Sequence, residues 1–188
     1  MAHREDAATP AVADSLTLWQ QIREDWQAHG CDWTKPGFRA VAVHRLGAWQ
    51  MHLSSPLLRV VLGRLYRSLY CKVRNRYGID LPSSVQLGRR VIFEHQGSIV
   101  IHANSVIGDD CIIRQGVALG YRYRHRPDAA PRLGERVNVG AGAKILGDIT
   151  IGSDVNIGAN AVVLTDVPPG QTAVGIPARL VSGQPAQL

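Results

Sequence analysis

Apolar residues recur at every sixth position through most of the C-terminal half of this chain. The first run is Ile101, Ile107, Ile113 and Leu119, and a second run resumes after a gap. Its members are Leu133, Val139, Ile145, Ile151, Ile157 and Val163. Glycine follows directly at 108, 120, 134, 140, 152 and 158. Neither the period of two of a strand nor the period of 3.6 of a helix explains this spacing, which indicates a structural repeat.

A second apolar position completes each repeat, four residues after the first. These positions hold Cys111, Val117, Val137, Ala143, Ile149, Val155, Ala161 and Val167. Each hexapeptide can then form one short strand and one turn, and three of them close a triangular coil with both apolar positions inside. Glycine tolerates the turn conformations that a residue with a Cβ resists. The sequence therefore predicts a mainly β fold, a left-handed parallel β-helix of hexapeptide repeats over 79–175.

The residues before this repeat predict a small α-helical region over 15–78. Ser15 is a plausible N-cap for a first helix that stops near Gly30. Pro36 opens a second helix through about Leu53. Pro56 opens a third helix, through Tyr77, that Gly78 ends. We expect a disordered tail over 1–14 and a C-terminal tail over 176–188.

The net charge of +6 is concentrated in this helical region. Residues 1–78 hold 11 Lys and Arg against 6 Asp and Glu, whereas 79–188 hold 10 against 9. The excess is densest in 56–77, which contains no acid. Such a segment can bind anionic lipid or nucleic acid, or it can be a solvated face or a face that meets acids of a partner subunit. The absence of aromatic interleaving and of a nucleic-acid motif favours the latter two, so we expect no nucleic-acid partner.

The remaining composition indicates a cytoplasmic protein. Cys31, Cys71 and Cys111 are widely spaced and odd in number, which argues against a disulfide framework and against a zinc site. The N-terminus has no apolar signal region, and no run of about 18 apolar residues exists to span a membrane.

Two irregularities interrupt the repeat. Phe93 and Ile101 are eight residues apart, which shifts the phase by two, and Leu119 and Leu133 are fourteen apart. The second gap, 121–132, is polar and contains proline, so we expect an excursion loop there. Insertions in a solenoid tend to lie on its working face.

His95 is the main candidate for chemistry because it lies at the phase slip, where the coil must deviate. Imidazole is suited to act as a general base toward a hydroxyl group. Asp80, fifteen residues earlier, is close to one coil away and can orient and stabilise that imidazole. His95, His102 and His125 would also be the ligands of a metal-dependent lyase of the carbonic-anhydrase kind, although their spacings do not match that family. We expect no metal.

The stretch from Gly78 to Val181 resembles the serine acetyltransferases of the hexapeptide-repeat superfamily. The segments that carry this resemblance are Gly-Ile-Asp at 78–80, Glu-His at 94–95, Gly-Ser-Ile-Val at 97–100, Gly-Ala-Gly-Ala-Lys-Ile-Leu-Gly at 140–147, Ile-Gly-Ala-Asn-Ala-Val-Val at 157–163, Val-Pro-Pro at 167–169 and Gly-Ile-Pro-Ala-Arg at 175–179. The resemblance implies an acetyl-CoA-dependent O-acetyltransferase in which His95 is the catalytic base and Asp80 is its partner. It also implies that Glu94 binds the acceptor.

For coenzyme A, the resemblance implies a site in the cleft between two prisms. The pantetheine arm would pass the backbone at Gly120, Ala141 and Ala159, while Lys144 and Arg179 would meet the phosphates. A flat-sided prism predicts a homotrimer, and the family's larger assembly is a dimer of trimers.

The excursion loop departs from the family pattern. The family has an Arg-His pair before a proline at the end of this loop, where this chain has Ala129-Ala130 before Pro131. Arg124 and His125 are the loop residues that could replace the pair. The acceptor is therefore serine or, alternatively, a sugar or a polysaccharide precursor. A non-catalytic scaffold that acts through its basic helices is the remaining alternative.

Overall fold

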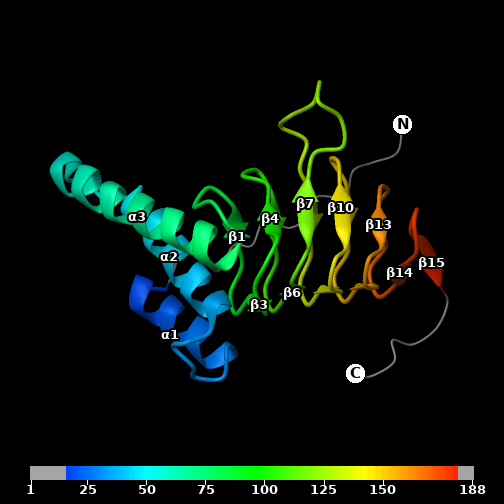
Figure 1. Cartoon of the computed structure of the whole chain (residues 1–188), viewed down its shortest axis with the longest axis horizontal. Helices are drawn as coiled ribbons and strands as arrows, with labels where there is room; N and C mark the ends of the chain where they lie inside the picture. The colour runs from blue at the N-terminus through cyan, green and yellow to red at the C-terminus, as the bar shows by residue number, and fades with distance from the viewer. Residues whose placement is uncertain (1–15, 182–188) are drawn as a thin grey trace.

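A computed structural model describes residues 16–181 as three helices followed by a β-solenoid (Figure 1). The expected N-terminal tail and Ser15 lie outside the described residues, as does most of the expected C-terminal tail. Among the described residues, no helix is both long and apolar enough to cross a membrane.

The three helices largely follow the expected boundaries. Helix α1 spans Leu18–Ala28, and Thr17 caps it through a capping box with Gln20, so the helix begins later than a Ser15 cap would allow. Helix α2 spans Pro36–Gln50, three residues short of the predicted end. Helix α3 spans Pro56–Tyr77, and Gly78 ends it in the left-handed conformation with φ of 64°.

The solenoid consists of three sheets that wind together. The first sheet contains β1 (Ile79–Asp80), β4 (Ile99–Ile101), β7 (Ala118–Gly120), β10 (Lys144–Leu146) and β13 (Val162–Val163). The second contains β2 (Gln86–Leu87), β5 (Val106–Ile107), β8 (Arg132–Leu133) and β11 (Thr150–Ile151). The third contains β3 (Ile92–Glu94), β6 (Ile112–Arg114), β9 (Asn138–Val139), β12 (Asn156–Ile157), β14 (Thr172–Val174) and β15 (Arg179–Val181). From β1 to β13 successive strands visit the sheets in turn, and neighbours within a sheet are parallel except β14 and β15.

The predicted six-residue repeat is the core of this solenoid. Every position predicted to point inward is buried, from Ile101 to Val163 in the first set and from Cys111 to Val167 in the second. Residues equivalent in successive coils stack in register, for example Ile107 on Leu133 and Leu133 on Ile151. The expected fold, a left-handed parallel β-helix behind a small helical region, is confirmed.

Other elements adjoin the described solenoid at each end. Helix α2 packs against β3 so closely that a Cβ on Gly37 would lie 1.9 Å from the carbonyl oxygen of Phe93. Arg45 of α2 binds Asp25 of α1 and also donates to the carbonyl oxygens of Leu87 and Gly88. At the other end, Arg179–Val181 form β15 and pair antiparallel with β14, so this part of the expected C-terminal tail belongs to the solenoid.

Candidate active site

His95 lies at the corner between β3 and β4, where the repeat gains its two extra residues. The corner turns through three positive φ angles, 65° at His95, 105° at Gly97 and 54° at Ser98. Positive φ also occurs at other corners of the solenoid, for example 53° at Arg90 and 58° at Asp110, so at His95 it marks the turn of the chain. The side chain of His95 is exposed, whereas Phe93 and Ile99 on either side of the corner are buried. The phase slip therefore places an imidazole in solvent on a constrained backbone.

Asp80 lies one coil before this corner, as expected, but its carboxylate is held by a residue that sequence reasoning missed. Strand β1 pairs with β4 so that Asp80 is opposite Val100. The hydroxyl group of Tyr70, on α3, donates a hydrogen bond to Oδ1 of Asp80. Burial and then this hydrogen bond raise the pKa of Tyr70 to about 12, so Tyr70 stays a donor. Among the described residues, no hydrogen bond joins Asp80 to His95.

Glu94 is also engaged by a neighbour that the sequence did not reveal. Its Oε2 lies 2.9 Å from Nε of Arg114, in the adjacent strand of the third sheet. Arg114 in turn donates to Oδ1 of Asn138. This contact could have been predicted from the sequence, because Arg114 occupies the same outward position as Glu94 one coil later. Glu94 thus lies beside His95 with an arginine fixing its carboxylate.

The corners between the third and first sheets stack into one edge of the prism, which we call the His95 edge (95–98, 115–117, 140–143 and 158–161). Backbone hydrogen bonds connect the corners: Gly116 N donates to Gly97 O, Gly142 N to Gln115 O, and Asn160 N to Ala141 O, at 2.9, 2.8 and 2.8 Å. Two of the predicted coenzyme A contacts, Ala141 and Ala159, therefore lie on the same edge as His95.

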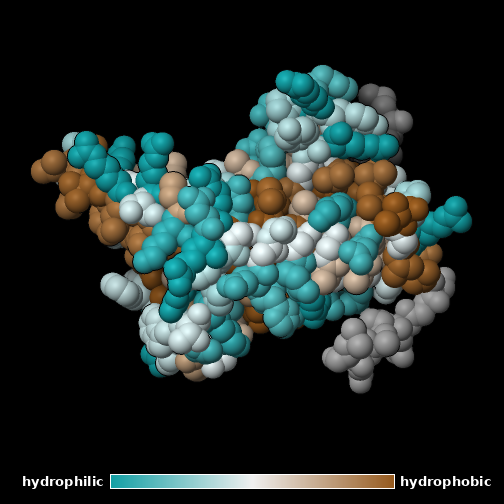
Figure 2. Space-filling view, in the orientation of Figure 1, coloured by the Kyte–Doolittle hydropathy of each residue, from teal (hydrophilic) through white to brown (hydrophobic). Residues whose placement is uncertain are grey.

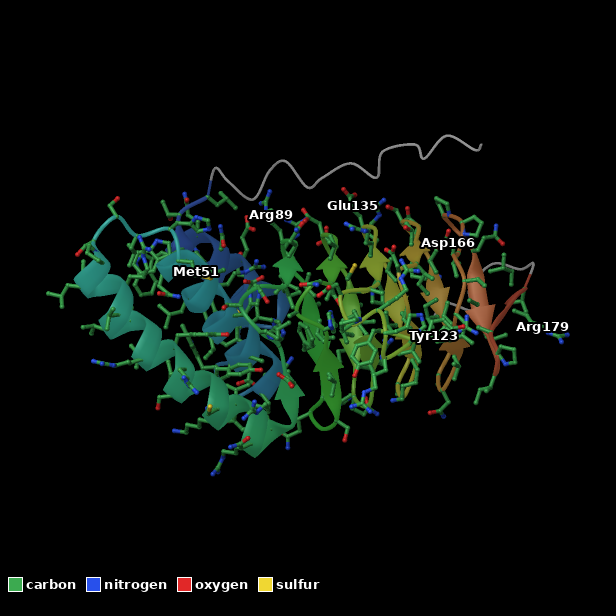
Figure 3. The ribbon with its side chains drawn as sticks, turned by 90° about the horizontal axis from the view of Figure 1, so that it is seen from above. Met51, Arg89, Tyr123, Glu135, Asp166 and Arg179 are labelled. Atoms are coloured by element: carbon green, nitrogen blue, oxygen red, sulfur yellow. The ribbon has the colours of Figure 1, made fainter. Side chains whose placement is uncertain are left out.

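The two predicted phosphate-binding cations differ in their surroundings. Lys144 follows the His95 edge in β10, and its ammonium group donates to the carbonyl oxygen of Gly116 on that edge. Arg179 is exposed, begins β15 and lies at the end of the solenoid away from the helices (Figure 3). No described residue forms an ion pair with either cation.

The excursion loop leaves the prism at a different edge, between the first and second sheets, which we call the loop edge. The loop projects from the solenoid after β7 (Figure 1). It ends at Pro131, since Arg132 already belongs to β8. Arg124 and His125 are exposed in it, and the ring of His125 stacks on Tyr123 with centroids 5.5 Å apart. Gly120, the third predicted coenzyme A contact, also lies at this edge.

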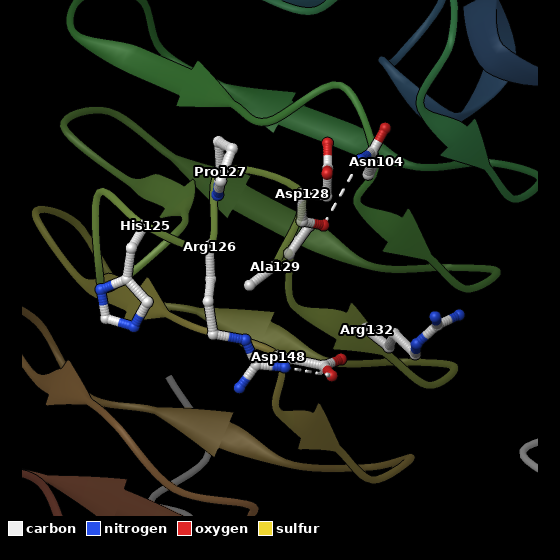
Figure 4. Close-up of a pocket in the computed structure, with 9 residues that line it drawn as sticks. Asn104, His125, Arg126, Pro127, Asp128, Ala129, Arg132 and Asp148 are labelled. Carbon is white, nitrogen blue, oxygen red and sulfur yellow. Dashed lines mark hydrogen bonds and ion pairs between the residues drawn. The ribbon is translucent and has the colours of Figure 1, made fainter.

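A hollow of about 510 Å³ lies beneath the loop (Figure 4). Nδ2 of Asn104 donates to the carbonyl oxygen of Asp128, and Arg126 lies 3.9 Å from Asp148. Ala129 and Ala130, which occupy the place of the family's Arg-His pair, line the hollow without offering a side-chain donor.

The two sets of predicted site residues are not brought together within one chain. His95, Ala141 and Ala159 lie where the strands of the first sheet begin, whereas Gly120, Arg124 and His125 lie where its strands end. Within one protomer, Arg124 and His125 therefore lie on a different edge of the prism from His95. His102 lies at the loop edge, with its Nδ1 accepting from Asn104 N. Within 16–181 no three His, Cys, Asp or Glu side chains form a metal-binding group.

Comparisons with known proteins agree with the repeat. Residues 130–165 match the family model for the bacterial transferase hexapeptide (six repeats). The fold and this match define the class of the chain, the hexapeptide-repeat transferases.

Individual relatives identify the family within this class more narrowly. The soybean serine acetyltransferase apoenzyme superposes with a TM-score of 0.75 at 34% identity, over 87% of this chain and 69% of that one. The Brucella abortus enzyme in complex with coenzyme A gives 0.74 at 29% identity, over 88% and 68%. The serine acetyltransferase of Synechococcus elongatus is 39% identical over 146 residues, 78% of this chain and 57% of the relative. The Escherichia coli K12 enzyme is 37% identical over 149 residues, 79% and 52%. The chain belongs to the serine acetyltransferase family, and it spans about half the length of these two sequence relatives.

Proposed function

We propose that this chain is an acetyl-CoA-dependent O-acetyltransferase in which His95 is the general base. The observation that carries the proposal is the exposed imidazole at the only eight-residue step of the repeat, in a chain whose relatives are serine acetyltransferases. His95 takes the proton of the acceptor hydroxyl as its oxygen attacks the thioester carbonyl. Coenzyme A leaves as the thiol after it gains a proton, and the acceptor leaves as an acetyl ester.

Asp80 and Tyr70 position the base and stabilise its charged form. The carboxylate of Asp80 lies on the strand beside the His95 corner, and the hydrogen bond from Tyr70 fixes its rotamer. A carboxylate near an imidazolium lowers the free energy of the protonated base. Glu94, fixed by Arg114, is the acceptor-binding carboxylate next to the base.

Coenzyme A binds along the His95 edge. The edge offers small residues, Ala141 and Ala159, which allow a thin chain to approach the backbone. Four coil steps of about 4.8 Å separate the corner of His95 from the corner before Arg179, which gives about 19 Å. That length suits an extended pantetheine arm with its thioester at His95 and its phosphates near Arg179 and Lys144.

A homotrimer completes this site. Because His95 and the excursion loop lie on different edges of one prism, a neighbouring subunit must supply Gly120, Arg124 and His125 if they are to reach the acceptor. A cyclic assembly repeats that contact three times. The reducing cytoplasm is the compartment that fits the free cysteines Cys31, Cys71 and Cys111.

The loop favours a second candidate acceptor, a sugar or polysaccharide precursor. Ala129 and Ala130 cannot bind the carboxylate of serine as an Arg-His pair would. Arg122, Arg124 and Arg132 have no ion-pair partner among the described residues, and Arg122 covers the ring of Tyr123 at 5.0 Å. Aromatic rings and free guanidinium groups suit a larger, anionic acceptor.

Thiol release from acetyl-CoA tests the function and the acceptor together. The panel contains serine, homoserine, free sugars and nucleotide sugars. We expect turnover with one class and a loss of about 10²–10⁴-fold in His95→Ala. His52→Ala, at an exposed histidine after α2, is the matched control and should keep full activity. Near-full activity of His95→Ala would contradict the assigned base. If coenzyme A gives no thermal shift at all, the scaffold alternative is supported instead.

A further inference from the structure

The first half of helix α3 exposes an apolar surface that nothing in the described chain covers. Leu57 is 72% exposed, and Leu58, Val60, Val61 and Leu65 are each about half exposed. In the space-filling view these residues form a hydrophobic area at the free end of α3 (Figure 2). We call this set the tip surface. Contiguous exposed apolar residues on one element mark an interaction site more often than scattered ones do.

The opposite face of α3 already has its partners, so the helix is fixed with the tip surface outward. The hydroxyl group of Tyr66 accepts a hydrogen bond from Ser83 N at 2.9 Å, Tyr70 binds Asp80, and Val73 is buried. These residues recur at helical spacing on the side that faces α2 and the solenoid. The tip surface is therefore the face of α3 that no residue within 16–181 covers.

Basic side chains flank the tip surface along the same helix. Arg64, Arg67, Lys72 and Arg76 are exposed, and none has an ion-pair partner among residues 16–181. The helix carries no acidic residue at all. An apolar stripe bordered by Lys and Arg is the pattern of helices that lie in the interface of an anionic bilayer.

A second copy of this chain fits the charges poorly. In the described chain, most carboxylates are occupied by ion pairs, and those without one are Asp32, Asp80, Asp128 and Asp166. Asp80 belongs to the candidate site, and Asp166 accepts from Thr150 N. A symmetric contact between two α3 helices would also bring like charges together. Anionic lipid headgroups would supply the negative charge that these cations lack among residues 16–181.

We propose that helix α3 docks the protein on an anionic lipid surface, with the tip surface inserted among the lipid chains and the flanking cations on the headgroups. Such docking is peripheral, in keeping with the lack of a described membrane-spanning helix. It does not depend on the proposed catalytic activity.

Co-sedimentation of the full chain with vesicles tests this proposal. The vesicles are phosphatidylcholine alone and phosphatidylcholine with phosphatidylglycerol. We expect binding to the anionic vesicles only, weakened by salt. The double variants Leu58→Gln/Val61→Gln and Arg64→Gln/Arg67→Gln should each weaken binding about tenfold or more. Ile176→Gln, equally apolar and 73% exposed at the far end of the solenoid, is the control and should bind as the parent does.

Two results would overturn the proposal. The first is a parent protein that stays in the supernatant with anionic vesicles. The second is equal binding by the parent and both α3 variants. Light scattering of the same samples identifies the competing occupant: an assembly that becomes smaller in Leu58→Gln/Val61→Gln, without vesicle binding by the parent, would make the tip surface a contact between copies.

Discussion

Asp25 and Arg45 form an ion pair that is almost completely shielded from solvent, with Nε of Arg45 2.9 Å from Oδ2 of Asp25 and side chains 7% and 1% exposed. The remaining donors of Arg45 bind carbonyl oxygens at the start of the solenoid. One guanidinium group thus connects α1, α2 and the first coil.

Removal of one partner from this pair should be costly. In Asp25→Ala the guanidinium group of Arg45 stays buried without its carboxylate, and we expect the free energy of unfolding to fall by about 3–5 kcal/mol. Urea denaturation followed by circular dichroism measures it. Glu24→Ala, which removes the neighbouring and more exposed pair with Arg89, is the control and should change little. If both substitutions lower the free energy of unfolding equally, burial does not determine how much the Asp25–Arg45 ion pair contributes to stability.

The surroundings of Gly37 and Gly63 predict opposite effects on stability for their substitution by alanine. Gly37→Ala places a Cβ 1.9 Å from the backbone oxygen of Phe93, so α2 must move away from β3 and the protein should be destabilised by several kcal/mol. Gly63 lies on α3, where an added Cβ would be 3.6 Å from Oε1 of Gln50, an ordinary contact distance, so Gly63→Ala should stabilise the protein by about 0.5–1 kcal/mol. The melting temperatures of both variants, compared with that of the parent, test these two predictions. A stabilising Gly37→Ala would contradict the close packing.

His44 predicts a loss of stability in acid. Burial and then the nearby charge of Arg45 lower the pKa of His44 from 6.5 to about 3, although a hydrogen bond to the carbonyl oxygen of Val85 opposes this shift. The unfolded chain therefore binds a proton that the folded chain rejects. The stability that neutral His44 allows is fully present above pH 6.5. As the pH falls from 6.5 toward 3, the free energy of unfolding decreases by about 1.4 kcal/mol per pH unit.

The variant His44→Gln isolates that contribution, since glutamine can keep a donor for Val85 without titrating. Its free energy of unfolding should fall less steeply than that of the parent between pH 6.5 and 4. The slope that remains includes His29, whose pKa burial also lowers. Parallel slopes for parent and variant would mean that His44 titrates normally.

Tyr70→Phe tests the positioning of Asp80. The variant keeps the ring that stacks on Tyr66 but removes the hydrogen bond to the carboxylate. Under the proposed mechanism, we expect kcat to fall several-fold with little change in KM, and the pH profile of kcat to shift as Asp80 relaxes. Tyr66→Phe, which loses a hydrogen bond to Ser83 N outside the site, is the matched variant. If both variants behave alike, the role of Tyr70 is structural.

The sequence predicted the regular parts of this molecule well because a repeat is visible along the chain. The spacing of Ile107, Leu133 and Ile151 is enough to predict their stacking, and Pro56 and Gly78 mark the ends of α3 through backbone geometry alone. Tyr70 and Arg45 could not be predicted in the same way, since their partners lie across junctions between unlike elements. Tyr70 reaches Asp80 only after α3 turns at Gly78, and Arg45 reaches Leu87 only after α2 docks.

The candidate site was likewise predictable only in part from the sequence. The eight-residue step predicted that the coil deviates at His95, and it does so with a left-handed residue. Arg124 and His125 were named only as loop residues that could replace the Arg-His pair, which the family resemblance places at Ala129 and Ala130. A triangular coil separates successive corners, and strand order alone assigns this loop to the other edge.

The described coils of the solenoid stack in register, each one strand separation from the next. Helix α2 packs against β3 at one end, and at the other end the antiparallel β15 ends the parallel ladder of the third sheet. The spacing between His95 and Arg179 is therefore an integral number of strand separations, fixed by the count of repeats. Under the proposed function, the number of coils therefore sets the length of the thioester substrate that the prism can bind. Deletion of one whole coil should shorten the distance between His95 and Arg179 by about 4.8 Å and favour a shorter acyl carrier. The chemistry at His95 should not change.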